Sequence, residues 1–156
     1  MPNWVRNCIS VEEKYSEKLE EISKAGLARF YFPLPEDLKE TKAPPKIGEN
    51  ISKEKSESLI DRYEFNNWYD WAVSNWGTKW GCCDNEFKDK EYWFNTAWCP
   101  LSSHVFEKLS KDIPNFKFMW EEEQGFGQKW ECKNGVFTMI EEWEMPDWDE
   151  LLKSTN

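Results

Sequence analysis

The sequence has few aliphatic side chains for its length. Leu, Ile, Val and Phe together make up about 20% of the 156 residues, which is near the level at which chains are usually disordered. Tryptophan compensates, because 11 Trp help to bring the aromatic fraction to 17%. Disordered acidic segments lack such large apolar side chains, which offset the entropy lost when a chain becomes ordered. We therefore expect one folded domain over residues 1–156, with tryptophan replacing missing aliphatics in its core.

Long apolar runs are also missing. A membrane-spanning helix needs about 18 or more consecutive uncharged apolar residues, and no window of the sequence approaches that. The opening residues, MPNWVRN, lack the basic and then apolar order of a secretory signal. The sequence therefore predicts a cytoplasmic protein that does not bind membranes.

Cysteine and histidine are too few and too poorly spaced for a disulfide framework or a zinc site. The five cysteines are scattered, there is no C-x-x-C pair, and His104 is the single histidine. Scattered thiols in odd number are typical of a reducing compartment. Structural zinc requires ligand pairs that reach one ion. We therefore expect no metal and no cofactor.

Recognisable catalytic groups are equally scarce. His104 follows Ser102 and Ser103, but a nucleophile needs a base brought to it by the fold, and adjacency in sequence is no evidence of that. The GFG segment at 125–127 follows acidic residues, whereas a phosphate-binding loop favours the opposite charge and a following helix. The sequence gives no catalytic residue and favours a protein that is not an enzyme.

Positive charge is scarce, above all in one quarter of the chain. The whole chain carries a formal charge of −10, and residues 115–150 hold ten Asp and Glu against three Lys, a local charge of −7. Such a field repels phosphate backbones, so we expect no non-specific binding to nucleic acid. It suits a protein partner with a basic surface, or simply keeps the protein soluble. The candidate partner-binding residues are Glu121, Glu122, Glu123, Glu141, Glu142 and Glu144.

Hydrophobic periodicity predicts an α+β order of elements. The first half is expected to form a strand over 3–11, a helix capped by Ser10 and ended by Gly26, a strand or extended arm over 27–32, a polar loop over 39–57 and a helix over 58–75. The second half is expected to form a strand over 92–96, a helix from Ser102 or Ser103 to Asp112, strands over 116–122, 128–133 and 136–144, and a helical turn over 147–152. Asn134 and Gly135 predict a hairpin turn between the last two strands. This order predicts an antiparallel sheet with helices on one face, of ferredoxin-like topology with an inserted helix at 58–75.

Four short motifs lie along the chain. They are MPNW followed by Asn7, NWGTKW at 75–80, TAWCP at 96–100 and EEEQGFG at 121–127. Together they resemble the YubB-type ferredoxin-like domain family of plasmid and bacteriophage proteins, from Met1 to about Trp143. The chain departs from that family at Gly81, where an acidic residue is common, and in the alignment of EEEQGFG. The resemblance implies the ferredoxin-like fold and a mobile-element setting, and it implies no biochemical role.

The NWGTKW and TAW motifs supply the candidate ligand-binding residues. Indole rings are suited to form the flat walls of a small site, and Lys79 to hold a carboxylate or phosphate or to stack on an indole. The other interpretation is a structural corner of interlocked tryptophans, with Lys79 in water. In both, Gly77 is expected to adopt positive φ because two tryptophans crowd the turn. The candidates are Asn75, Trp76, Thr78, Lys79, Trp80, Thr96 and Trp98.

Two hypotheses about function follow. The first is a non-enzymatic interaction module of a mobile element that binds a basic protein through its acidic surface. The second is a small-ligand-binding protein or enzyme that uses the tryptophan corner. The position of Lys79 separates them, because a ligand site requires this side chain to line a pocket rather than point into water.

Overall fold

The computed structural model describes residues 3–144, and its elements follow an α+β order. The expected helical turn over 147–152 lies outside these residues. The N-terminal half contains β1 (Trp4–Ser10), the 3-10 helix η1 (Glu13–Tyr15), α1 (Ser16–Ala25), α2 (Leu27–Tyr31), the 3-10 helix η2 (Glu36–Leu38), α3 (Lys53–Tyr63) and α4 (Trp68–Trp76). The C-terminal half contains β2 (Cys83–Lys88), β3 (Glu91–Ala97), α5 (Ser103–Asp112), β4 (Phe116–Glu122), β5 (Gly127–Lys133) and β6 (Val136–Trp143).

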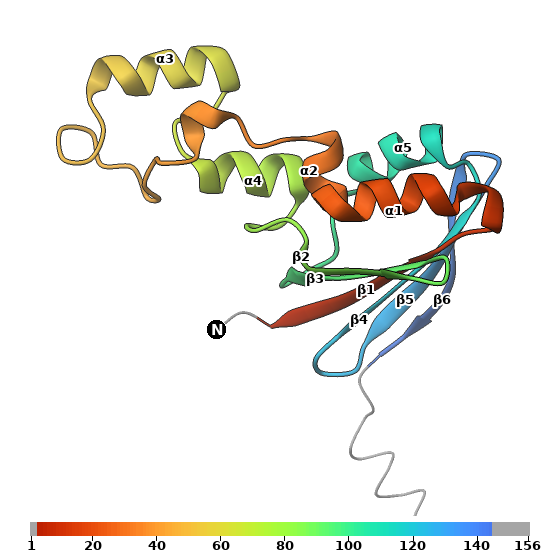
Figure 1. The fold of residues 1–156 in the computed structure, drawn as a ribbon. Coiled ribbons are helices and arrows are strands. Elements are labelled where there is room, and N and C mark those ends of the chain that lie inside the picture. Colours follow the sequence, from red (N-terminus) through yellow and green to blue (C-terminus); the bar gives the residue numbers. More distant parts are fainter. Residues whose placement is uncertain (1–2, 145–156) are drawn as a thin grey trace, which may run out of the picture.

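The six strands form one open antiparallel sheet in the order β2-β3-β1-β4-β5-β6. The central strand β1 places Ile9 opposite Tyr92 on β3 and opposite Phe118 on β4. Figure 1 shows α1 and α5 together on one face of the sheet, with α3 and α4 further out. The predicted α+β class and antiparallel sheet are therefore confirmed, and β6 lies at one edge.

The core lies between the helix-bearing face of the sheet and helices α1 and α5. Along β1 the side chains of Val5, Asn7 and Ile9 are fully buried, as expected for alternate residues on the covered face of a strand, whereas Arg6 is exposed. Leu19 of α1 and Leu109 of α5 are buried opposite them. Aliphatic and aromatic side chains share this core.

The tryptophans mostly do not replace aliphatics in the core. Of those in residues 3–144, only Trp71 and Trp76 are buried. An indole is large and carries an N–H that needs a partner, so it favours the boundary of a core. At this boundary Trp120 and Trp130 both donate their Nε1–H to Gln128 Oε1, at 3.2 and 2.9 Å.

Local hydrogen bonds correct several predicted boundaries in the first half. Ser10 belongs to β1 rather than capping a helix, and Gly26 does end α1, as predicted. The 27–32 segment is the short helix α2, and the backbone N–H of Leu27 donates to the buried hydroxyl of Tyr92 at 3.1 Å. This hydrogen bond holds the start of α2 close to the sheet.

The helix expected over 58–75 is two helices, and the first begins inside the expected loop. Ser52 caps α3 by accepting from the N–H of Lys55 at 3.1 Å, so residues 53–57 are helical rather than a loop. Glu64, with φ +71°, ends α3, and Asn67 then caps α4. The break follows from these end signals rather than from a change in apolar pattern.

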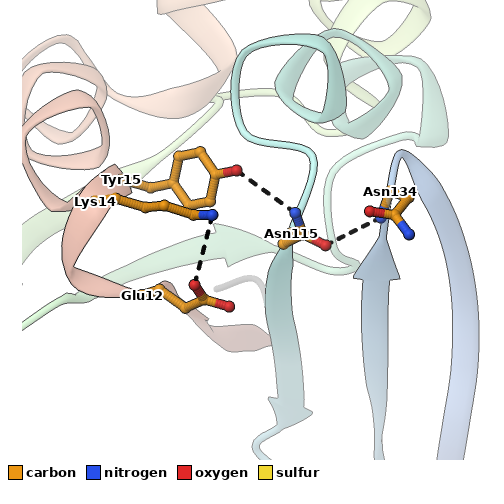
Figure 2. A network of polar contacts seen from close by, with 5 residues as sticks. All are labelled: Glu12, Lys14, Tyr15, Asn115 and Asn134. Carbon is orange, nitrogen blue, oxygen red and sulfur yellow. Dashed lines mark hydrogen bonds and ion pairs between the residues drawn. The ribbon is translucent and has the colours of Figure 1, made fainter.

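The predicted hairpin at Asn134-Gly135 is present and is tied to the rest of the sheet. Both residues have positive φ, +51° and +82°, as two-residue hairpin turns require. Figure 2 shows Asn115 between them and η1: its Oδ1 accepts from the N–H of Asn134 at 3.0 Å, and its Nδ2 donates to the hydroxyl of Tyr15 at 3.5 Å. The β5–β6 hairpin is thus anchored at its turn.

No helix between residues 3 and 144 is long and apolar enough to cross a membrane.

Candidate functional site

Gly77 turns the chain from α4 into the rest of the NWGTKW motif. It caps α4 with φ +84°, as predicted. The neighbour that excludes a side chain there is not a tryptophan, because an added Cβ would lie 2.9 Å from the backbone N of Ser102. Tryptophan crowding falls instead at Gly81, where an added Cβ would lie 3.3 Å from the ring of Trp76. The turn is packed directly against the start of α5.

Four of the seven candidate ligand residues bond the protein's own backbone. Their side chains connect the end of α4 to the end of β3 and to the preceding chain, as the structural-corner interpretation predicts. The donors and acceptors are Asn75 Nδ2 to Trp71 O (2.9 Å), Trp76 Nε1 to Phe32 O (2.8 Å), Thr78 Oγ1 to Ala97 O (2.7 Å) and Thr96 Oγ1 to Cys99 O (2.7 Å).

The other three candidates, Lys79, Trp80 and Trp98, come together at the surface and are named the tryptophan cage below. The ammonium of Lys79 lies 4.0 Å from the ring centroid of Trp80 and 4.7 Å from that of Trp98. The two indoles are 37% and 44% exposed. Trp4 packs on Trp80 with ring centroids 5.7 Å apart. Lys79 therefore points neither into a closed pocket nor away from the protein, but onto two indole rings.

Trp98 holds its place through a strained turn. Its φ is +72°, and the N–H of Cys99 donates to the carbonyl of Ala97 at 2.9 Å across it, an i to i+2 hydrogen bond. A γ-turn with positive φ at a bulky residue is rare and costs on the order of 1–3 kcal/mol. The surroundings fix it, because the N–H of Trp98 donates to Asn3 O at 2.8 Å and Cys99 Sγ donates to Gly77 O at 3.2 Å. The ring position is thus set by the backbone.

The acidic candidates divide into one buried and five surface residues. Glu122 is buried and faces the helix side of the sheet, with Oε2 accepting from the N–H of Gln124 at 2.8 Å. Its side chain is therefore not part of an exposed surface, which corrects its inclusion among the partner-binding residues. Alternation along β4 explains this, because Glu122 has the same parity as the buried Phe118. Glu121, Glu123, Glu141, Glu142 and Glu144 are exposed.

Strand β6 carries Glu141 and Glu142 together with exposed apolar side chains, and Glu144 follows directly after it. Val136, Met139 and Ile140 are 66%, 43% and 59% exposed. Met139 lies opposite Trp130 on the helix-bearing face, while Ile140 lines a groove of about 380 Å³ on the other face together with Trp93 and Met119. The β6 edge is defined here as Val136, Met139, Ile140, Glu141, Glu142 and Glu144. The sequence did not reveal that this strand lies at an edge of the sheet, because edge strands and inner strands show the same alternation of apolar and polar residues.

The contacts of His104 and the burial of Cys8 and Cys82 disfavour reactive states of these side chains. His104 Nε2 contacts both Ser102 Oγ, at 3.0 Å, and the carbonyl of Asn75. A nitrogen that donates to a carbonyl has no lone pair free to take the serine proton. Burial raises the pKa of Cys82 to about 12, and burial together with Glu91 raises the pKa of Cys8 to about 12. Both thiols are protonated at neutral pH.

No metal position stands out in the part of the chain that the structure describes, since no three His, Cys, Asp or Glu side chains converge there. No protein-family model matches this chain, and neither a curated protein nor a solved structure matches it. The resemblance to the YubB-type family therefore stays a prediction, and the tryptophan cage and the β6 edge are the two candidate sites that the residues themselves supply.

Proposed function

We propose that the protein is a non-enzymatic interaction module that binds a partner protein with a basic surface through the β6 edge. The observation that carries this proposal is the exposure of apolar side chains on both faces of an edge strand that carries Glu141 and Glu142 and is followed by Glu144. Within residues 3–144, β6 pairs with β5 alone. Its outer backbone groups are therefore suited to accept a strand from another chain.

Charge selects the partner in this proposal. Glu141 is matched by Lys129, with the ammonium and carboxylate 3.8 Å apart, and Glu142 accepts from Gln128 Nε2 at 2.7 Å. These contacts leave the edge acidic in a chain whose formal charge is −10. The negative charge of the edge would attract lysine and arginine side chains of a partner strand. This attraction raises the association rate, and added salt weakens it.

The proposal includes a ferredoxin-like fold and a mobile-element setting. Strand order β2-β3-β1-β4 with α1 after β1 and α5 after β3 supports the fold, with α3 and α4 as an insertion before β2 and with β5 and β6 as an extension of the sheet. The motifs MPNW, NWGTKW and TAWCP support a plasmid or phage protein acting in the cytoplasm. A role in taking over a basic host protein is consistent with both.

Site-specific crosslinking tests the β6 edge. A photo-crosslinking residue replaces Ile140 in one protein and Ile60, an exposed residue of α3, in another. We expect a basic protein from bacterial cytoplasm to crosslink at position 140 and not at 60, with a yield that falls as salt rises. Crosslinking at both positions alike, or only to acidic proteins, contradicts the proposal.

A charge variant with a matched control completes this test. Glu141→Gln, Glu142→Gln and Glu144→Gln together remove the charge of the β6 edge, and Glu17→Gln, Glu20→Gln and Glu21→Gln remove the same charge from the exposed side of α1. We expect the first triple variant to lose the crosslink at Ile140 and the second to keep it. Equal loss in both would assign the effect to net charge rather than to this edge.

The tryptophan cage supports a second candidate function, a small-ligand-binding protein or enzyme. The specific observation is that two exposed indoles already face one cation, Lys79. In this candidate the two indole rings form the walls of a ligand site and Lys79 supplies its charge.

A further inference from the structure

We infer that Trp80 and Trp98 form an aromatic cage for a methylated ammonium head group, and that Lys79 is a competitor for it supplied by the chain itself. This inference rests on the second candidate function. The face of an aromatic ring attracts a cation within about 6 Å of its centroid, and Lys79 meets this condition for two rings at once. A position at which two ring faces meet one ammonium is the geometry that recognises such head groups.

The cage is unlike the other cation–ring contacts of residues 3–144. Arg6 over Trp93, at 4.5 Å, and Arg29 over Trp76, at 4.9 Å, each involve a single ring. A single ring leaves most of a cation in water, whereas two rings remove more water and strengthen the attraction. Arg6 and Trp93 also lie on the helix-free face of the sheet, so they provide a matched control within the same molecule.

The walls of the cage are fixed before any ligand arrives. The γ-turn at Trp98 is bonded on both sides, to Asn3 and Gly77, and Trp80 packs on Trp4. A site whose walls do not move loses little conformational entropy on binding. Strain that the surroundings maintain at one exposed indole is a pattern associated with ligand sites. The strain and the two-ring contact are independent observations, and both point to this position.

The chemistry of ammonium groups explains why a methylated ligand can displace Lys79. A primary ammonium is compact and strongly hydrated, so it gives up much solvation when it enters a cage. A trimethylammonium group spreads the same charge over methyl groups and gives up less. The formal charge of −10 on the whole chain further concentrates cations near the surface. Lys79 must leave both rings before a ligand cation can take its place.

Titration with tetramethylammonium chloride tests the competitor role of Lys79. The indole N–H signals of Trp80 and Trp98 are followed by NMR in the wild-type chain and in Lys79→Ala. We expect both signals to shift in a saturable way, and the dissociation constant of Lys79→Ala to be about three- to tenfold lower, because the competing cation is gone. Equal affinities in the two proteins, or no saturable shift in Lys79→Ala, overturn the inference.

Two further variants keep this result specific. Arg6→Ala removes the cation of the single-ring contact and is expected to leave tetramethylammonium affinity at the cage unchanged. Trp98→Gly removes one wall at a position with positive φ, and is expected to lose saturable binding while the other indole signals stay in place. Ammonium chloride at the same ionic strength controls for charge. A response to it equal to that of tetramethylammonium overturns the inference.

Titration with inorganic phosphate distinguishes a failure of this inference from a failure of the second candidate function. If Lys79 instead holds an anion, phosphate shifts the cage signals and Lys79→Ala abolishes that shift, which rejects the ammonium ligand and keeps the ligand site. If neither ion binds saturably, both are rejected. Choline and a short peptide with one trimethyl-lysine then identify the source of the head group: a tighter peptide indicates a protein-borne group, and equal affinity indicates a free small molecule.

Discussion

The tryptophan cage and the β6 edge both expose large apolar side chains, yet they are built in opposite ways. In the cage, Trp98 occupies a strained turn whose neighbours are bonded on both sides. On the β6 edge, Ile140 and Val136 lie on a strand with a regular turn and few side-chain contacts that order them. The cage is pre-formed, whereas the β6 edge gains order only when something pairs with it.

This difference separates two kinds of binding. A pre-formed pair of rings suits a small ligand, because a small ligand makes few contacts. Those contacts provide all the binding free energy and cannot also offset the entropy cost of ordering the site. An open strand suits a chain partner, because repeated backbone hydrogen bonds compensate for that ordering. Substitutions at the cage should therefore alter protein stability, whereas substitutions at the β6 edge should leave it nearly unchanged.

The largest expected effect follows from placing a side chain at the base of the cage. Gly77→Ala forces positive φ on alanine and brings a Cβ to within 2.9 Å of the backbone of Ser102. We expect the free energy of unfolding in urea to fall by about 3 kcal/mol. Gly48→Ala is the control, since Gly48 has φ +90° and open space around it, and should cost only about 1 kcal/mol. Equal costs would show that the turn at Gly77 is not tightly packed.

Alkaline pH is expected to produce the next effect on stability, through a buried thiol close to the cage in sequence. Cys82 lies just after the NWGTKW motif, and burial raises its pKa from 9.0 to about 12. The folded protein holds this proton more tightly than the unfolded chain, so the contribution is intact below pH 9 and is lost as the pH rises toward 12. Urea unfolding should show the free energy of unfolding falling as the pH rises above 9.

Cys82→Ala provides the control for the alkaline effect. The variant is expected to have a flatter decline in stability above pH 9, whatever its stability at neutral pH. Cys8, whose pKa is also raised to about 12, keeps part of the slope. The triple glutamine variant of the β6 edge should retain the full slope. A slope unchanged in Cys82→Ala would contradict the role given to this thiol.

Sequence patterns predicted the elements whose signals are local. Strands with alternating burial, the Asn134-Gly135 turn and the positive φ of Gly77 all follow from short-range rules. The short strand β2 was missed because its residues are mostly exposed and show little alternation. The break between α3 and α4 depends on the cap at Asn67, which a continuing aromatic pattern concealed.

The sites were harder to predict because they depend on packing between distant segments. NWGTKW and TAW indicated that seven residues belong together, and they do meet, but only the fold separates Thr78 and Thr96, which bond backbone carbonyls, from the exposed Trp80 and Trp98. Likewise, a run of glutamates gives no indication that Glu122 is buried until the register of β4 against β1 is known. The charge count therefore identified an acidic region of the sequence, but not which of its residues lie on the surface.

A smaller effect concerns the strain at Trp98. Both Trp98→Gly and Trp98→Ala remove the indole, so they differ mainly in the backbone that φ +72° imposes. We expect the glycine variant to be more stable than the alanine variant by about 1 kcal/mol in urea unfolding, because glycine adopts positive φ without steric cost. Equal stability would mean that the turn relaxes once the ring is gone, and that the indole rather than the surrounding hydrogen bonds holds it.

The smallest effect on stability belongs to the β6 edge. Ile140→Lys places a charge where the side chain is already 59% exposed, so the free energy of unfolding should change by no more than about 0.5 kcal/mol. The same substitution puts a cation in the path of a basic partner and should abolish crosslinking from a probe at Val136, while Ile60→Lys on α3 should leave it intact. A loss of stability larger than about 1 kcal/mol would show that Ile140 is packed in the folded chain. The β6 edge would then resemble the cage in being ordered beforehand, and its exposed apolar residues would no longer indicate a partner.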